Sequence, residues 1–413
     1  MTTSEASGRL VIRGHLISDD RSIGDGAVAF DGDRIAFAGP AAEFETLPEA
    51  GSYAGVDVPA GSLLLPGLVD LHCHGAAGGD FASADPAMVR RAVDFLHQAG
   101  TTTLLASLVS APPEAMLEAA GTLAGLAEEG LVEGIHAEGP FLAASRCGAQ
   151  DPSVLTDPDP GFVDALVAVS RGQLRTMTYA PELADADGLV EQLAQHGVVP
   201  SIGHTDADLE TTAASLRLAR EELASAGFDG FTERPTVTHL FNAMTPPHHR
   251  RPGAVTACLE AAATGGAVVE LIADGHHLAP ETVRAVFALA GPEAVALVTD
   301  SMAATGLPDG DYRLGRADVV VRGGEARLAA DGRLAGGTAT LLEVLRSTVE
   351  AGVPLAEAVV SATCVPATVL GLADEVGALH AGFRADLLVL SPDLRLRAVY
   401  RRGVELEPNN RAT

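Results

Sequence analysis

The chain has 413 residues, of which 47% are hydrophobic and 45 are glycine, a composition that fits a large α/β protein rather than a disordered one. Its net charge of −28, from 55 acidic and 27 basic residues, argues against nucleic acids and anionic membranes as partners. All the basic residues are arginines, which excludes a Gly-Lys phosphate loop, a lysine Schiff base and a lysine carbamate between two metals.

Targeting signals and disulfides are not expected. No uninterrupted apolar run approaches the ~20 residues that a membrane-spanning helix needs. The segment Met1–Glu5 lacks the basic region and apolar core of a secretion signal. Four cysteines lie far apart without a CxxC pair, so we expect free thiols and a cytoplasmic protein.

Both ends of the chain are rich in short β-type segments, and Asp31-Gly32 is a strong hairpin signal. We expect a small β-sandwich built from residues 1–62 and 365–413, flanking a body at 63–364. Its predicted strands are Arg9–Ile17, Ala27–Phe30, Arg34–Ala38, Ala385–Leu390 and Ala398–Arg401.

The body alternates strand-like and helix-like segments. Eight βα units over this length predict an α/β fold, a (β/α)₈ TIM-like barrel. The predicted strands are Leu64–His72, Thr102–Ser107, Gly134–Glu138, Leu174–Ala180, Val198–His204, Thr236–Leu240, Ala267–Ala273 and Ala294–Asp300, and helical periodicity marks Pro86–Gln98, Pro113–Ala127, Ala207–Ala224 and Pro280–Leu289.

Several of these strands end in a residue that can bind a metal ion. Barrel strands are buried on both faces and are normally apolar throughout, and active sites of such barrels lie at the carboxyl ends of the strands. Convergence of histidine, glutamate and aspartate on that rim indicates a metal site. The residues are His72, His74, Glu138, His204, His239 and Asp300.

Glu138, His204 and His239 form a set that suits zinc with one open position for water. His72 and His74, sharing Glu138 or Asp300, extend this to a second ion. Asp300 is placed to act as the general base, so metal-assisted hydrolysis is the predicted reaction class. Because these ligand types also accept Fe²⁺, Mn²⁺ or Co²⁺, the number and identity of the ions stay open.

Other polar residues near the rim have two interpretations each. Asn242 and Ala243 either hold a substrate or close an Asx turn. At least one of His276 and His277 is expected to face the site. The basic cluster at residues 248–251 is either an anion pocket or a solvated loop, and His136 either supports the ligands or belongs to the core.

The order of motifs adds a resemblance. PGLVDLHCHG, HAEGPF, GHT, HLFNAM, DGHH, VTDSM and LAGGT together resemble the N-acetylglucosamine-6-phosphate deacetylases of the amidohydrolase superfamily. The resemblance implies a homodimer that hydrolyses the acetamido group of this phosphosugar to glucosamine 6-phosphate and acetate. An N-acetylgalactosamine 6-phosphate deacetylase, another amide hydrolase of the superfamily, and a scaffold without activity are the alternatives.

The resemblance also assigns roles. It implies metal binding by Glu138, His204 and His239, catalysis by Asp300, and substrate binding by Asn242, Ala243 and His277. A family arginine that reaches the phosphate in the neighbouring subunit matches Arg250, with Arg251 as the alternative. One departure is Gln150, which stands where many members carry a histidine that polarises the substrate carbonyl. A glutamine can donate a hydrogen bond there but cannot carry charge.

Overall fold

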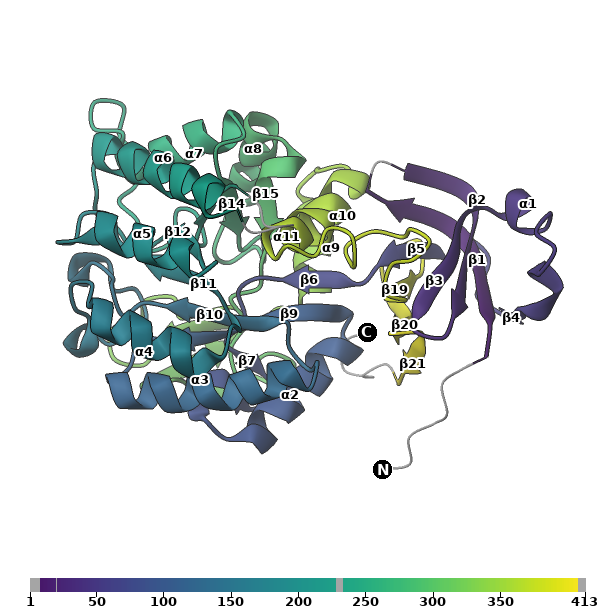
Figure 1. Cartoon of the computed structure of the whole chain (residues 1–413), viewed down its shortest axis with the longest axis horizontal. Coiled ribbons are helices and arrows are strands. Elements are labelled where there is room, and N and C mark those ends of the chain that lie inside the picture. Colours follow the sequence, from purple (N-terminus) through teal and green to yellow (C-terminus); the bar gives the residue numbers. More distant parts are fainter. Residues whose placement is uncertain (1–7, 20, 228–232, 408–413) are drawn as a thin grey trace.

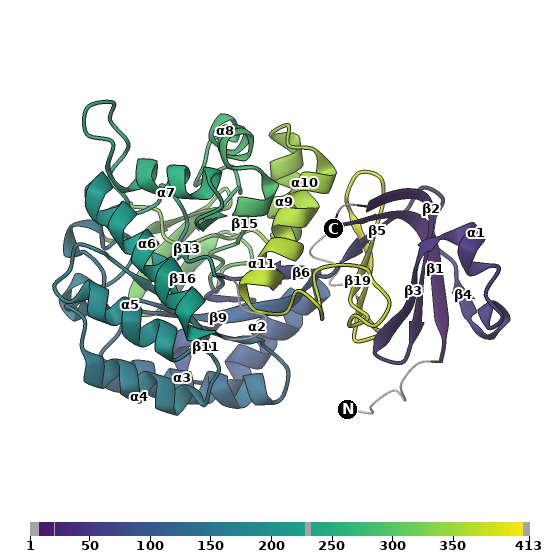
Figure 2. The same ribbon diagram turned by 45° about the horizontal axis from the view of Figure 1, so that its top comes forward.

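In a computed structural model, residues 8–19, 21–227 and 233–407 are described, so both termini of the predicted small domain lie outside the described part. The chain forms a large barrel domain beside a smaller β-domain (Figure 1). Helices α9 (Leu341–Glu350), α10 (Leu355–Ala362) and α11 (Cys364–Val369) lie on the side of the barrel that faces the small domain, as Figure 2 also shows.

The predicted barrel is confirmed. Eight parallel strands are hydrogen-bonded in the order β15-β14-β13-β12-β11-β10-β9-β6. A parallel bridge between Cys73 and Ser301, together with the Asp300 N–H donating to the His72 carbonyl at 2.9 Å, joins the first and last strands at the rim. The strands are β6 (Leu68–Asp70), β9 (Thr101–Val109), β10 (Gly134–Glu138), β11 (Leu174–Tyr179), β12 (Val199–Ile202), β13 (Thr236–Val237), β14 (Val268–Leu271) and β15 (Val295–Leu297).

The outer helices begin where the sequence supplies N-terminal caps. Asp85 and Asp159 each accept backbone N–H bonds before a proline in the first turn, and Thr340 forms a reciprocal capping box with Glu343. Besides α9–α11, the helices of the barrel are α2 (Pro86–Gln98), α3 (Pro113–Glu128), α4 (Pro160–Ser170), α5 (Ala186–Gln195), α6 (Leu209–Ala226), α7 (Gly253–Ala263) and α8 (Pro280–Ala290). None of the described helices is long and apolar enough to cross a membrane.

The small domain is built from both ends of the chain, as predicted, and its strands are hydrogen-bonded in one continuous order, with Phe30 of β2 packed against Tyr400 of β20. Its order is β21-β20-β19-β5-β1-β2-β3, with β4 beside β1. A short helix α1 (Ala41–Phe44) follows β3. The strands are β1 (Leu10–Ser18), β2 (Arg21–Asp31), β3 (Arg34–Pro40), β4 (Ala54–Val56), β5 (Leu63–Pro66), β19 (Leu387–Leu390), β20 (Leu396–Arg401) and β21 (Val404–Leu406).

The predicted strand Leu64–His72 is divided at Gly67. Its first part is β5, which pairs with β19 in the small sheet, and only its second part, β6, enters the barrel. A Cβ atom at Gly67 would lie 2.1 Å from Thr102 Oγ1, so the close approach of the two domains requires glycine. At the other predicted division, near residue 364, α11 packs its valines on the apolar side chains of β6 and β15.

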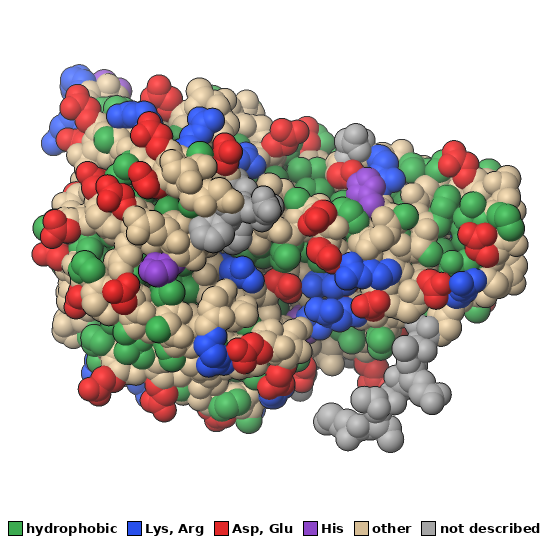
Figure 3. Space-filling view, in the orientation of Figure 1, with side chains coloured by type: hydrophobic (Ala, Val, Ile, Leu, Met, Phe, Trp, Pro, Cys, Tyr) green, Lys and Arg blue, Asp and Glu red, His purple; other side chains and the backbone are tan. Residues whose placement is uncertain are grey.

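A three-stranded antiparallel sheet between β15 and α9 was not predicted. It consists of β16 (Gly310–Leu314), β17 (Ala317–Arg322) and β18 (Glu325–Leu328), and its inner side chains form a separate apolar cluster with Val109 and Met302. A two-stranded ribbon, β7 (Gly75–Ala76) and β8 (Gly79–Asp80), lies after β6. Acidic side chains are spread over the face shown in Figure 3, as the net charge leads one to expect.

Candidate active site

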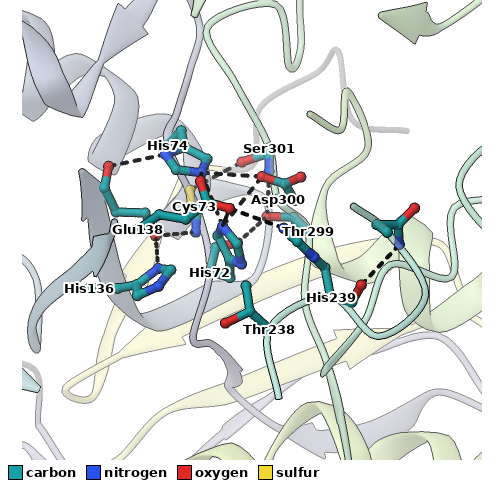
Figure 4. A network of polar contacts seen from close by, with 12 residues as sticks. His72, Cys73, His74, His136, Glu138, Thr238, His239, Thr299, Asp300 and Ser301 are labelled. Atoms are coloured by element: carbon teal, nitrogen blue, oxygen red, sulfur yellow. Dashed lines mark hydrogen bonds and ion pairs between the residues drawn. The ribbon is translucent and has the colours of Figure 1, made fainter. Parts of the chain in front are cut away.

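The six predicted ligand residues come together at the carboxyl ends of the barrel strands. Glu138 is the last residue of β10, and the other five lie in the loops directly after β6, β12, β13 and β15. They form two groups whose ligand atoms lie within 4.8 Å of one another: Glu138, His204 and His239 in one, and His72, His74 and Asp300 in the other. Figure 4 shows how His72, His74 and Asp300 face each other.

The first group surrounds one carboxylate oxygen. Glu138 Oε1 lies 2.8 Å from His204 Nε2 and 3.0 Å from His239 Nε2, and the two ring nitrogens are 3.1 Å apart. Glu138 is 3% exposed, His204 4% and His239 3%. A buried carboxylate between two imidazoles is the donor set that zinc and similar divalent ions prefer.

The second group has the same composition as the first, two imidazoles and one carboxylate. His72 Nε2 and His74 Nε2 are 3.0 Å apart, and Asp300 Oδ1 lies 3.4 Å and 3.2 Å from them. Glu138 Oε2 lies 3.2 Å from His74 Nε2, which places this carboxylate between the two groups. One glutamate therefore borders both candidate ion positions.

Neighbouring oxygen atoms fix the orientation of three of the rings. Because a carbonyl or carboxylate oxygen only accepts, the proton of each ring sits on Nδ1 and the Nε2 lone pair points into the group. The Nδ1–H donates to Glu270 Oε2 from His72 (3.1 Å), to the Ser107 carbonyl from His74 (3.2 Å) and to the Arg146 carbonyl from His204 (2.8 Å). His239 differs, since its buried Nδ1 has no partner among the described residues.

The positions of these ring protons show whether the residues fit a metal ion. Two unprotonated Nε2 atoms about 3 Å apart cannot hydrogen-bond to each other, so a proton or a cation is required between them. Burial lowers the imidazole pKa, yet the nearby carboxylates, led by Asp300, raise the pKa of His72 to about 9 and that of His74 to about 10. The carboxylates at the site therefore stabilise a bound proton or cation, and its residues fit divalent ions.

The pKa values of the two carboxylates, Asp300 and Glu138, are shifted downward. Burial favours their neutral forms, but His72 and His74 lower the pKa of Asp300 to about 2, and His204 and His239 hold the pKa of Glu138 well below its usual value. Both groups are therefore ionised at neutral pH.

The backbone at the site is strained. His204 (φ 49°), His239 (φ 30°), Ala243 (φ 51°) and Asp300 (φ 47°) all occupy the left-handed region, which side chains other than glycine seldom adopt. Such conformations cost of order 1–3 kcal/mol each and persist where the surrounding structure imposes them, typically at functional sites.

A cavity of about 510 Å³ opens above both groups. Four of the predicted substrate residues line it, namely Gln150, Asn242, Ala243 and His277. Arg250 does not: it is exposed in a loop outside the cavity, and its role at the neighbouring subunit stays a prediction. Three arginines that the sequence did not single out line the cavity instead, namely Arg146, Arg327 and Arg333.

Two predicted substrate residues are held by their own loops. The Asn242 side-chain amide donates to the His239 carbonyl at 3.2 Å, so this residue both stabilises its turn and borders the cavity. Asp274 Oδ2 lies 2.8 Å from His277 Nδ1, and although burial opposes it, this contact raises the pKa of His277. The neighbouring His276 lines a different cavity.

Glu270 was missed by the sequence analysis. It is 3% exposed on β14, and its Oε2 accepts from His72 Nδ1 and from the His239 backbone N–H at 3.2 Å. A carboxylate inside an otherwise apolar strand was the available signal. His136 belongs to neither ligand group, because both its ring nitrogens are engaged, by Ser107 Oγ at 2.9 Å and Thr178 Oγ1 at 2.8 Å.

Comparisons with known proteins agree with this geometry. Residues 63–409 match the amidohydrolase family. The N-acetylgalactosamine-6-phosphate deacetylase of Escherichia coli O157:H7 is 34% identical over 83% of this chain and 87% of its own length, and the N-acetylglucosamine-6-phosphate deacetylase of Bacillus subtilis is 34% identical over 84% and 85%.

A solved structure is also similar. The D267A mutant of N-acetyl-D-glucosamine-6-phosphate deacetylase from Mycobacterium smegmatis, in complex with N-acetyl-D-glucosamine 6-phosphate, superposes with a TM-score of 0.87 at 37% identity, covering 97% of this chain and 100% of that one. The family match and the relatives both cover most of the chain, and it therefore belongs to the amidohydrolase family.

Proposed function

We propose that this protein hydrolyses N-acetyl-D-glucosamine 6-phosphate to D-glucosamine 6-phosphate and acetate. The observation that carries the proposal is the pair of metal-type groups at the floor of a cavity whose wall bears an amide, a histidine whose pKa, despite burial, is raised by Asp274, and arginines. A floor of this kind suits amide hydrolysis, and such a wall suits a phosphosugar. Relatives that bear this activity in their names span most of the chain.

Glu138, His204 and His239 would hold one divalent ion, and His72, His74 and Asp300 a second. Zinc is the ion we propose, with Fe²⁺, Mn²⁺ and Co²⁺ as alternatives that the same donors accept. When bound, such an ion polarises an amide carbonyl and makes water acidic enough to react at neutral pH.

Asp300 is proposed as the general base. Its carboxylate is ionised near neutrality, borders the cavity and lies beside both rings of the second group. It would accept a proton from the attacking water and return it to the amide nitrogen, so that the amine leaves in a neutral form.

The sugar phosphate is proposed to lie at Asn242, Ala243 and His277, with Gln150 near the acetyl group. Arg250 of a second copy would reach this phosphate in a homodimer, and a phosphate of about −2 charge explains a basic loop on so acidic a protein. The cytoplasmic location inferred from the sequence stays a prediction.

The galactosamine analogue is the second candidate, because the E. coli relative named for it is as similar as the B. subtilis one. We would measure acetate release from both phosphosugars with protein as purified, after chelation, and after reloading with Zn²⁺. Loss on chelation and recovery with Zn²⁺, with the gluco substrate preferred, supports the proposal. A preference for the galacto substrate, or turnover that survives complete metal removal, contradicts it.

A further inference from the structure

Gln150 makes a contact that a residue serving only the substrate would not need. Its side-chain Nε2 donates to Glu138 Oε2 at 2.5 Å, while its Oε1 accepts the Ser110 backbone N–H at 2.8 Å. The side chain is 7% exposed, so both bonds are shielded from water. Gln150 therefore links the main chain of one barrel loop to the carboxylate that borders both candidate ions.

The orientation of this amide is fixed by its partners. Because the Ser110 N–H can only donate, the amide oxygen must face it, and the NH₂ group must then face Glu138. Ser110 also fixes Glu138 from the other side, since its hydroxyl donates to the Glu138 carbonyl at 3.0 Å. The three hydrogen bonds form a closed ring that links the Glu138 carboxylate to the main chain of Ser110 and of Glu138 itself.

As a result, the two carboxylate oxygens of Glu138 have different partners. Oε2 accepts from Gln150 and also lies 3.2 Å from His74 Nε2 in the second group, whereas Oε1 faces His204 and His239 at 2.8 and 3.0 Å. We infer that Gln150 is a positioning residue, which turns Oε1 of Glu138 toward the His204–His239 pair and thereby sets how tightly that group binds its ion. This rests on the proposed function only in taking Glu138 to be a metal ligand.

The test compares Zn²⁺ affinity, by competition with a chelator, in the wild type, Q150M, Q150H and Q192M. Methionine fills the space of glutamine without a donor, and histidine restores a ring N–H. Gln192 is the matched control, because its amide also donates to a carboxylate, Asp164, but on the outer surface. Loss of a hydrogen bond to a metal ligand typically costs about 10–100-fold in affinity.

We expect Q150M to bind Zn²⁺ about 10–100-fold more weakly, Q150H to recover much of this loss, and Q192M to match the wild type. Raising Zn²⁺ should recover the part of the Q150M activity that is lost through weaker ion binding, and a deficit that remains at saturating Zn²⁺ reports the contact of Gln150 with the acetyl group. Q150M with wild-type Zn²⁺ affinity and an activity deficit that excess Zn²⁺ leaves unchanged would overturn the inference. Should Q150M not fold, Q150N, whose amide is one methylene too short, takes its place.

The two proposals fail separately. If the wild type binds Zn²⁺ but does not hydrolyse either phosphosugar, the proposed function is wrong and the affinity series still decides the role of Gln150. If the wild type is an active deacetylase and Q150M and Q150N both bind Zn²⁺ as tightly as it does, the function stands and the role of Gln150 is refuted.

Discussion

Glu270 offers a sharp test of how the ligand histidines are held. Its single oxygen Oε2 accepts from His72 Nδ1 and from the backbone N–H of His239, one residue from each ligand group. In E270L both donors stay buried without an acceptor. Each unsatisfied donor costs about 1–3 kcal/mol, so the metal-free protein should lose about 2–6 kcal/mol of unfolding free energy.

The same change should weaken Zn²⁺ binding about 10–100-fold, because the ring of His72 loses the partner that fixes its tautomer. E270Q keeps an acceptor oxygen at the same place and loses only the charge, so its defect should be clearly smaller. The assay is urea unfolding of metal-free protein together with chelator competition. Exposed Glu260 on α7 supplies the control E260L. An E270L protein as stable as E260L, with unchanged Zn²⁺ affinity, would refute this reasoning.

Three further predictions concern the reaction, the phosphate and pH. D300N should lower kcat about 10²–10⁴-fold while the Glu138 group still binds Zn²⁺, as metal analysis would show; near-normal turnover would remove Asp300 as the base. R250A and R333A should each raise KM about 10-fold or more for a phosphorylated substrate and little for the unphosphorylated sugar; equal effects on both would place that arginine away from the phosphate. The pKa values of His72 and His74 are raised to about 9 and 10, so their contribution to the stability of the metal-free protein is fully present below about pH 6.5 and should be lost as pH rises through 9–10. Zn²⁺ affinity should rise over the same interval, because the ion competes with these protons. A stability profile that is flat between pH 6.5 and 10 would contradict this.

The barrel was predictable because the alternation of strand-like and helix-like segments can be recognised within short stretches of sequence. Strand β10 runs from Gly134 to Glu138 as predicted, since a glycine marks its start and a carboxylate its end. At the break, Pro66-Gly67 is a local signal for an interrupted strand, but the close approach that requires glycine there depends on Thr102 and Asp386, which meet that backbone only in the folded protein. The β16–β18 sheet did carry signals, namely Gly315 and Gly323-Gly324 between short apolar runs, that a closer reading could have used.

At the site, residue types predicted which side chains would converge, but not how they are oriented. Nothing in the sequence near His72 indicates that Glu270, almost 200 residues away, holds its ring, or that Gln150 engages Glu138. The arginines that line the cavity were missed for the same reason, because Arg327 reaches it from the unpredicted strand β18, Arg333 from the segment after that strand and Arg146 from the segment after β10. The functional roles of all these residues stay predictions.

The shared sheet of the small domain also bears on how the chain folds during synthesis. Strand β5 has β19 as a neighbour, from Leu63 opposite Leu390 to Pro66 opposite Leu387, so one edge stays open until the ribosome has made the intervening residues. At 5–20 residues per second, that interval is roughly 20–60 s. An unpaired, fully apolar strand edge invites aggregation over such a time. We therefore expect the nascent chain to depend on chaperones until its last strands emerge, and truncation before Leu387 to yield insoluble protein even though every barrel strand is present.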